Sequence, residues 1–208
     1  SEINQTNDSS FVETKHLSPN NSGYKINYIL HPVPGGYRIQ ENGKTISKGL
    51  SLTFFPLRKH GKWTDFDSLS GRKVEEMEFE NGRDIGRNTC FFENGEILEN
   101  VFSFVDIDPI FRYQEMDLGK FIGQNLVYPK DAINANAQGR VYVTFIILSD
   151  GTLKDLRLLK GYFKSCDEES LRVVAATSGK WIPGVKNGTN VHVRVTLPII
   201  FRLTRTGK

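Results

Sequence analysis

A strict alternation of apolar and polar side chains runs through residues 191–203 and constrains this chain more than any other feature. One set of alternate positions is wholly apolar, comprising Val191, Val193, Val195, Leu197, Ile199, Phe201 and Leu203. The positions between and after them hold His192, Arg194, Thr196, Pro198, Ile200, Arg202 and Thr204. Because side chains alternate between the two faces of a strand, this pattern predicts one long β-strand with a buried and an exposed face.

Pro198 indicates that this strand lies at the edge of its sheet. Proline has no backbone N–H, so within sheets it is confined to edges and bulges. An open edge offers unpaired backbone groups to another strand, and adding a strand is a common way to bind an extended peptide. Arg194 and Arg202 on the exposed face favour an acidic or polar peptide. The alternative is that the edge pairs with itself in a homodimer, or with the N-terminal region.

The residues before this strand predict helices and further strands. Pro129 is a favourable first residue for a helix that ends at Gly139. A strand follows at Val141–Leu148, and Asp150-Gly151 turns the chain into a second strand at Leu153–Lys160. The next helix is expected to begin with a capping box formed by Ser165 and Glu168 and to end at Gly179. Its buried face is expected to hold Leu171, Val174 and Ala175. The order helix–strand–strand–helix–strand predicts an α+β fold, a two-layer domain of two helices on an antiparallel sheet.

The N-terminal half carries a different pattern, with a repeat of 13 residues. Phe66, Phe79 and Phe92 recur at this spacing, and Asn-Gly pairs stand at 42–43, 81–82 and 94–95. Asn-Gly favours the tight type I′ turn of a β-hairpin, and one aromatic ring per strand can stack on its neighbour's ring. The pattern therefore predicts an antiparallel β-hairpin repeat region. Segments such as Gly61-Lys62-Trp63 and Phe79-Glu80-Asn81-Gly82 resemble MORN-type repeats, and that resemblance implies a scaffold or an interaction surface.

Charge and composition predict three segments along the 208 residues. Residues 1–22 are polar and aperiodic, which predicts a disordered tail or linker. Residues 1–108 contain 12 Lys and Arg against 16 Asp and Glu, a net charge of −4, whereas residues 109–208 contain 15 against 8, a net charge of +7. We therefore expect a repeat region at 23–108 and a separate domain at 109–208, divided near Asp106–Glu115.

The sequence favours no enzymatic, cofactor or metal site. The four histidines share no metal-ligand spacing, and no nucleophile stands with a base, so no catalytic, cofactor-binding or metal-ligating residue is assigned. Basic residues are scattered rather than aligned, so we expect no nucleic-acid partner. Cys90 and Cys166 are expected to be buried thiols, and whether they form a disulfide stays open. No apolar stretch is long enough for a membrane helix. The chain begins at Ser1, so we expect that an upstream segment was removed.

Several motifs of the C-terminal half resemble the C-terminal domain of TonB energy transducers in the form common in Bacteroidetes. They occur in the family's order over roughly 90 residues. They are Leu126-Val127-Tyr128-Pro129, Gly139-Arg140-Val141-Tyr142-Val143, Ser149-Asp150-Gly151-Thr152, Cys166-Asp167-Glu168-Glu169-Ser170-Leu171, Lys180-Trp181-Ile182-Pro183-Gly184, Asn187-Gly188 and Val191–Leu203. The chain has Thr177-Ser178-Gly179 where the family usually has a small residue followed by Met-Pro.

This resemblance implies a function in the bacterial cell envelope. Members of the family pass proton-motive energy from an inner-membrane motor to outer-membrane TonB-dependent transporters. They bind an extended transporter segment, the TonB box, by β-augmentation. The resemblance thus implies a periplasmic protein that contributes to substrate import, with Tyr128 and Pro129 beside the binding strand and His192, Arg194, Thr196, Pro198, Ile200 and Arg202 on it. Coupling to the motor would require an anchor that this sequence does not contain. The alternative is an unanchored periplasmic or surface scaffold that keeps the fold for protein–protein interaction.

Overall fold

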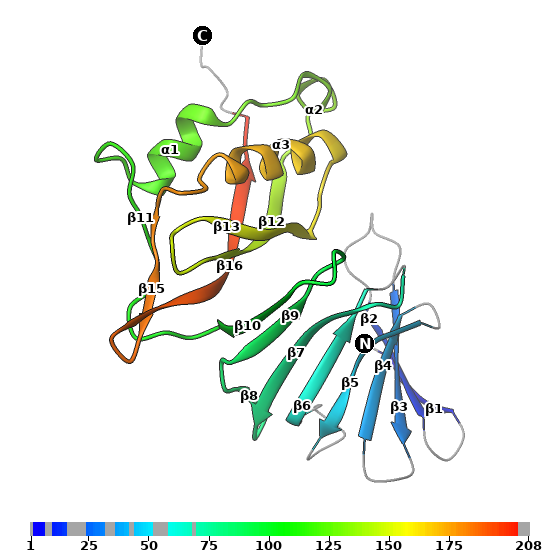
Figure 1. The fold of residues 1–208 in the computed structure, drawn as a ribbon. Coiled ribbons are helices and arrows are strands. Elements are labelled where there is room, and N and C mark those ends of the chain that lie inside the picture. The colour runs from blue at the N-terminus through cyan, green and yellow to red at the C-terminus, as the bar shows by residue number, and fades with distance from the viewer. Residues whose placement is uncertain are drawn as a thin grey trace. The chain divides into compact units, whose positions relative to one another are not determined.

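The computed structural model describes residues 2–6, 10–15, 24–31, 36–41, 44–51, 58–67 and 70–203. The chain forms two compact units, Ser1–Asn100 and Val101–Lys208 (Figure 1). Among its described residues the first unit has strands and turns but no helix, and the second unit combines helices and strands. The fold class predicted from the sequence, α+β, is confirmed.

The N-terminal unit is an antiparallel sheet in which each strand pairs with the next along most of the chain (Figure 1). Strand β7 pairs with both β8 and β9. The strands are β1 (Glu2–Thr6), β2 (Ser10–Lys15), β3 (Tyr24–His31), β4 (Gly36–Glu41), β5 (Lys44–Ser51), β6 (Lys59–Phe66), β7 (Lys73–Glu80), β8 (Arg83–Asp84), β9 (Asn88–Phe91) and the first part of β10 (Ile97–Phe102). This arrangement agrees with the hairpins expected from the sequence, while the relation to MORN-type repeats stays a prediction.

The three Asn-Gly pairs have different outcomes. Asn81 and Gly82 have φ angles of 52° and 85°, as a type I′ turn requires. At the next pair only Gly95 has a positive φ, and Phe92 N–H donates to the carbonyl of Glu96, so this turn is wider than predicted. The pair at 42–43 lies outside the described residues.

Two further features of this unit differ from expectation. The structure places β1 and β2 within residues 1–22, where the composition predicts a tail. Strand β2 pairs with β3 from Ser10↔Ile29 to Lys15↔Tyr24, and backbone pairing of this kind does not require apolar side chains.

The repeated aromatic rings, which were expected to stack on one another, have lysine side chains beside them. The Nζ atoms of Lys48 and Lys59 lie 5.2 and 4.9 Å from the ring centroids of Phe66 and Phe79.

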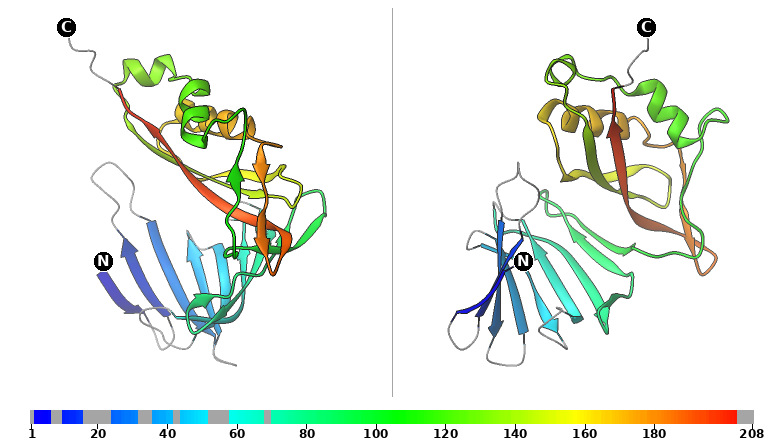
Figure 2. Two further views of the ribbon diagram at one scale, coloured as in Figure 1. Left: turned by 90° about the vertical axis from the view of Figure 1, so that its left-hand side faces the viewer. Right: turned by 180° about the vertical axis from the view of Figure 1, so that it is seen from behind.

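The C-terminal unit is built on a sheet in which β16 pairs with β12 and β12 with β13. Figure 2 shows its helices gathered on one side of these strands. The elements are the end of β10, β11 (Ile110–Phe111), α1 (Leu118–Asn125), α2 (Lys130–Asn134), β12 (Gly139–Ile147), β13 (Leu153–Lys160), α3 (Lys164–Ala175), β14 (Trp181–Ile182), β15 (Gly184–Lys186) and β16 (Thr189–Phe201). Its core joins the apolar faces of β12 and β16 to Cys166, Val173 and Val174 of α3.

The helices depart from the sequence prediction in several details. Helix α1, which begins at the N-cap Asp117, was not expected. Helix α2 follows Pro129 as its N-cap and ends at Asn134, because Asn136 adopts a left-handed φ of 49°. The predicted capping box of α3 is wrong: its N-cap is Phe163 without a side-chain cap, and the buried Ser165 hydroxyl has no hydrogen-bond partner among the described residues.

The apolar face of α3 is also shifted from the expected one. Ala175 is exposed, whereas Val173 is fully buried together with Val174. Cys90 and Cys166 are both free and buried, which is the expected state of the two thiols.

The C-terminal unit begins earlier than the predicted boundary at residue 109. Val101 is fully buried and pairs with His192 of β16. The segment predicted as a polar linker continues the unit, because Asp106 and Ile107 donate backbone hydrogen bonds to the carbonyl of Val185. The polar composition of this segment gave no indication of the pairing, because backbone groups rather than apolar side chains form it.

Candidate functional site

The orientation of the β16 backbone follows from its register with β12. The pairing runs without interruption from Gly139↔Phe201 to Ile147↔Val193. Leu148 N–H donates to the carbonyl of Thr152 at 2.8 Å, so the even-numbered residues of β12 turn their backbone groups toward β13 and the odd-numbered ones toward β16. Odd-numbered residues of β16 therefore bond to β12, and even-numbered residues point away from it.

Two further observations agree with this orientation. The Thr144 hydroxyl donates to the carbonyl of Val195 at 3.2 Å, which places this odd-numbered carbonyl on the β12 side. Pro198 stands opposite Tyr142 in an outward position, where its missing N–H removes no bond to β12. The outer edge of β16 thus presents the backbone of Arg194, Thr196, Pro198 and Ile200.

Only part of this outer edge is available for another strand. Val101 and Phe102 of β10 pair in parallel with His192 and Val193, and β15 pairs with residues 189–191. From Arg194 to Phe201, β16 has no strand partner other than β12 among the described residues. We call residues 194–201 on the side away from β12 the open edge.

The two faces of β16 differ as the alternation predicts, but not along the whole strand. Val193, Ile199 and Phe201 are buried, while Thr196, Pro198 and Ile200 are exposed, Ile200 by 50%. Toward the start of the strand the second face is also covered: Ile146 of β12, which stands opposite Arg194, is fully buried. Beyond Arg194, the exposed residues of this face are therefore Thr196, Pro198, Ile200 and Arg202.

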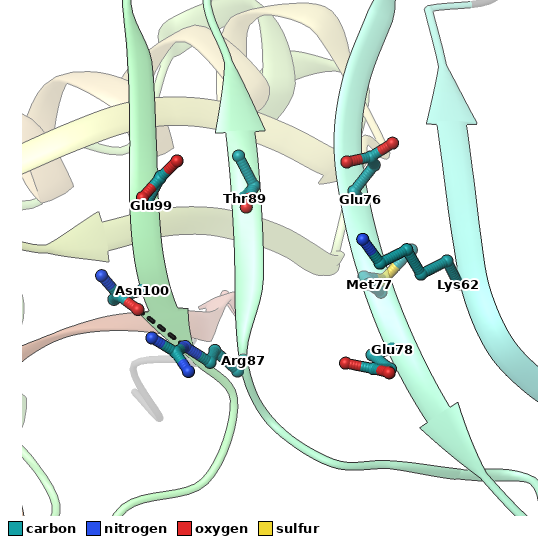
Figure 3. A pocket seen from close by; sticks show the side chains of 8 residues that line it. All are labelled: Lys62, Glu76, Met77, Glu78, Arg87, Thr89, Glu99 and Asn100. Carbon is teal, nitrogen blue, oxygen red and sulfur yellow. Dashed lines mark hydrogen bonds between the residues drawn. The ribbon is translucent and has the colours of Figure 1, made fainter.

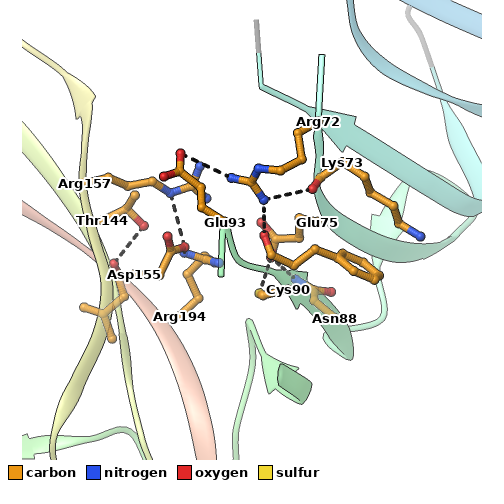
Figure 4. Close-up of polar contacts among 12 residues, drawn as sticks. Arg72, Lys73, Glu75, Asn88, Cys90, Glu93, Thr144, Asp155, Arg157 and Arg194 are labelled. Carbon is orange, nitrogen blue, oxygen red and sulfur yellow. Dashed lines mark hydrogen bonds and ion pairs between the residues drawn. The ribbon is translucent and has the colours of Figure 1, made fainter. Parts of the chain in front are cut away.

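Arg194 does not provide the free positive charge expected from the sequence. Its guanidinium donates to the Asp155 carboxylate at 2.8 Å, and Arg157 approaches the same carboxylate at 3.3 Å (Figure 4). Asp155 reaches this position because β13 contains a bulge between the pairs Thr144↔Arg157 and Ile146↔Lys154, and its own φ is 53°. The expectation that Arg194 attracts an acidic peptide is thus corrected, because its charge is already paired.

His192 is fixed by a backbone group. Its Nδ1 accepts a hydrogen bond from Ser149 N–H at 3.0 Å, which requires an unprotonated Nδ1. Burial lowers the pKa of His192, and the charge of Asp150 opposes this shift in part. His192 therefore holds the β12–β13 turn against β16 at the covered end of the strand.

Tyr128 and Pro129 lie near the opposite end of β16. The Tyr128 ring makes an edge contact with Phe201, with centroids 5.3 Å apart, and its hydroxyl donates to the carbonyl of Ala137. Burial raises the pKa of Tyr128. Pro129 serves as the N-cap of α2. These contacts give both residues a structural position beside the C-terminal end of the open edge.

The segment before Tyr128 is tied to α3 by a charged network that sequence reasoning missed. Val127 N–H donates to the Glu169 carboxylate at 2.6 Å, and Arg172 bonds to Glu169 and to the carbonyl of Asn125. The hydrogen bond from Arg172 lowers the pKa of Glu169. Glu169 and Arg172 are three residues apart on a helix, a spacing that signals an ion pair but not its tertiary partners.

The second edge of the sheet, on β13, is less suited to strand addition. Its register with β12 is broken twice, between Tyr142 and Val143 and between Thr144 and Ile146. Bulges and charged side chains such as Lys154 and Lys160 are features that protect sheet edges from pairing. The open edge of β16 is by contrast regular.

Unpaired positive charge gathers on the exposed face beside the open edge. Lys160, Tyr142 and Pro198 form one row across the three strands, and Arg140 and Ile200 form the next. Arg140, Lys160 and Arg202 are exposed, and in the described residues none of them has an ion-pair partner. This face is therefore basic and apolar.

Other polar groupings in the structure do not form a better site. A pocket of about 280 Å³ in the N-terminal unit is lined by Lys62, Glu76, Met77, Glu78, Arg87, Thr89, Glu99 and Asn100 (Figure 3). This volume is below the usual range of ligand pockets, and the Arg87 side chain already bonds to Asn100. In the same unit, Asn88 and Cys90 contact the buried Glu75 carboxylate (Figure 4). Within the described ranges no cluster of His, Cys, Asp or Glu could hold a metal ion.

The unusual residues at the end of α3 have defined roles. The Thr177 hydroxyl donates to the carbonyl of Val174 and accepts from the Trp181 indole at 3.1 Å. The Ser178 hydroxyl accepts from Leu153 N–H at 3.0 Å. Together these bonds connect the end of α3 to β13 and to the tryptophan against Phe145.

Comparison with known proteins gives one family. Residues 124–203 match the family model described as the Gram-negative bacterial TonB protein C-terminal, which confirms the resemblance seen in the sequence over this range. No curated protein matches the chain. In the part of the chain that the structure describes, no helix is long and apolar enough to cross a membrane.

Two solved structures are similar to part of the chain. They are NMR solution structures of the Helicobacter pylori TonB-CTD, residues 179–285 and residues 194–285. They share 23% and 24% sequence identity with this chain, with TM-scores of 0.34 and 0.32. The matches cover 42% and 40% of this chain, and 78% and 86% of the two solved chains.

Proposed function

Because residues 124–203 form a TonB C-terminal domain, we propose that the open edge of β16 binds an extended segment of an outer-membrane TonB-dependent transporter. The segment adds as a new strand beside residues 194–201, and the protein, located in the periplasm, thereby contributes to energy transduction for substrate import by the outer-membrane transporter. The observation that carries this proposal is the regular outer edge from Arg194 to Phe201, which besides β12 pairs with no strand formed by the described residues.

The backbone groups at this edge set how the segment is held. Thr196 and Ile200 each offer an outward N–H and an outward C=O, while Pro198 offers only its C=O. All three residues are exposed, as is expected of an edge that accepts another strand. Each backbone hydrogen bond stabilises the complex by about 1 kcal/mol, and ordering a flexible segment offsets part of this gain. These five backbone groups alone supply no more than about 5 kcal/mol, so the micromolar affinity that we expect, about −8 kcal/mol, also requires side-chain contacts of the bound segment.

The test removes one donor without changing the surface charge. In Thr196→Pro the outward N–H is lost, and Pro198 shows that β16 accommodates proline in an outward position. Thr196→Val keeps the N–H and is the matched control. Calorimetric titration with peptides from the N-terminal plug segments of TonB-dependent transporters should show binding to the wild type and to Thr196→Val. It should show at least fivefold weaker binding to Thr196→Pro, about 1 kcal/mol. Equal affinity of all three proteins would contradict strand addition at this edge.

A further inference from the structure

Pro198 has different consequences for a foreign strand and for a second copy of this chain. Two identical edges can pair only about a two-fold axis, which makes the strands antiparallel and repeats every contact. Any such ladder that includes Pro198 therefore lacks two N–H donors, one from each copy. A transporter segment that binds across the same position loses only one, because its own donors are intact.

We propose that Pro198 is a specificity-determining residue that makes the open edge select a foreign strand over a second copy of itself. This inference rests on the proposed function only in taking the open edge as the binding site. It explains why a long regular edge can remain unpaired until a transporter segment binds, since such an edge otherwise tends to pair with the same edge of another copy.

The positive charge on the exposed face also disfavours pairing between two copies of this chain. Arg140, Lys160 and Arg202 lie beside the open edge without ion-pair partners in the described residues. Edge-to-edge pairing of two copies brings both basic faces into one continuous sheet surface, where like charges repel. A segment without this excess of positive charge is free of that repulsion.

The proposal makes a quantitative prediction for Pro198→Thr in the full chain. The substitution restores one donor in a complex with a transporter peptide and two donors in a symmetric dimer. If one donor tightens peptide binding about fivefold, the dimerisation constant should rise by the square of this factor, about 25-fold. Ile200→Thr is the control, because it changes an exposed side chain of the same edge and leaves every N–H in place.

Sedimentation velocity over a range of protein concentrations measures self-association, and calorimetry measures peptide affinity. We expect Pro198→Thr to dimerise with hydrogen-exchange protection at the Thr196 amide, while the wild type and Ile200→Thr stay largely monomeric. The inference is overturned if Pro198→Thr dimerises no more than the wild type, if Ile200→Thr dimerises equally, or if the dimer leaves the Thr196 amide unprotected.

The two claims can fail separately. If no transporter peptide binds any variant while Pro198→Thr still dimerises through Thr196, the proposed function fails and the role of Pro198 against self-pairing stands. If peptides bind as proposed but self-association is insensitive to position 198, the inference about Pro198 fails and the proposed function stands.

Discussion

Arg194 of β16 and Asp155 of β13 form an ion pair of 2.8 Å across the intervening strand β12. Both side chains are largely buried, with 14% and 21% of their surface exposed. The pair lies where this face of the sheet is covered, and the exposed residues of the open edge begin at Thr196.

Asp155→Ala should reduce the free energy of unfolding by about 1–2 kcal/mol, because it leaves the Arg194 and Arg157 charges without their carboxylate. Urea unfolding of Asp155→Ala, Arg194→Met and the double variant measures the coupling between the pair. A coupling energy near zero would show that the ion pair contributes nothing to stability. Peptide affinity should change far less than stability, because Arg194 is engaged within the fold.

Stability should fall as the pH decreases from about 7 toward 5, and His192 should account for part of this change. Its pKa is lowered in the folded protein, so the unfolded chain binds the proton more readily and acid favours unfolding. The contribution is complete above the ordinary pKa of histidine and is lost as the pH falls through the lower folded value. In His192→Gln, whose amide oxygen can also accept from Ser149 N–H, the slope of unfolding free energy between pH 7 and 5 should be smaller. An unchanged slope would contradict this role.

Tyr128→Phe should cost about 1 kcal/mol of stability, since it removes the hydrogen bond to Ala137 but keeps the ring against Phe201. Tyr128→Ala removes the ring as well and should cost about 3 kcal/mol. Thermal unfolding distinguishes the two variants. Equal losses would show that the hydroxyl, rather than the ring contact with β16, provides the stability.

Gly151→Ala should destabilise the C-terminal unit by about 1–3 kcal/mol. Gly151 has a φ of 83°, and a Cβ atom there would lie 2.2 Å from the backbone oxygen of Trp181. Gly188→Ala is the matched control, because that glycine has a similar φ of 73° but open space around its Cβ position. Denaturant unfolding should show the larger loss for Gly151→Ala. Similar losses would mean that φ alone, rather than the close approach to Trp181, sets the cost.

The sequence predicted the elements whose side-chain pattern is local. The alternation at 191–203 located β16, and the bounds predicted for β13, Leu153–Lys160, are confirmed. Helix α1 was missed because Gly119 and Gly123 weaken its helical pattern, although Asp117 is a typical N-cap that accepts a hydrogen bond from Lys120 N–H.

The sequence did not predict which distant residues the charged side chains and the backbone groups contact. A bulge in β13 brings Asp155 to Arg194, and nothing in the sequence between them specifies that bulge. Likewise, Val101 and Phe102 pair with β16 through their backbone groups, and these residues precede a segment whose polar composition is typical of a linker. The outward position of Pro198 could be anticipated only in part, because proline indicates an edge but not which residues lie open.

The central claim, strand addition at the open edge, is tested most directly by hydrogen exchange of individual β16 amides with and without a transporter plug peptide. The amides of Val195, Leu197 and Ile199 bond to β12 and should be protected in both states. The amides of Thr196 and Ile200 point outward, and they should exchange quickly in the free protein and slowly in the complex. Unchanged exchange at Thr196 and Ile200 in a saturated complex, or new protection along β13 instead, would contradict the account.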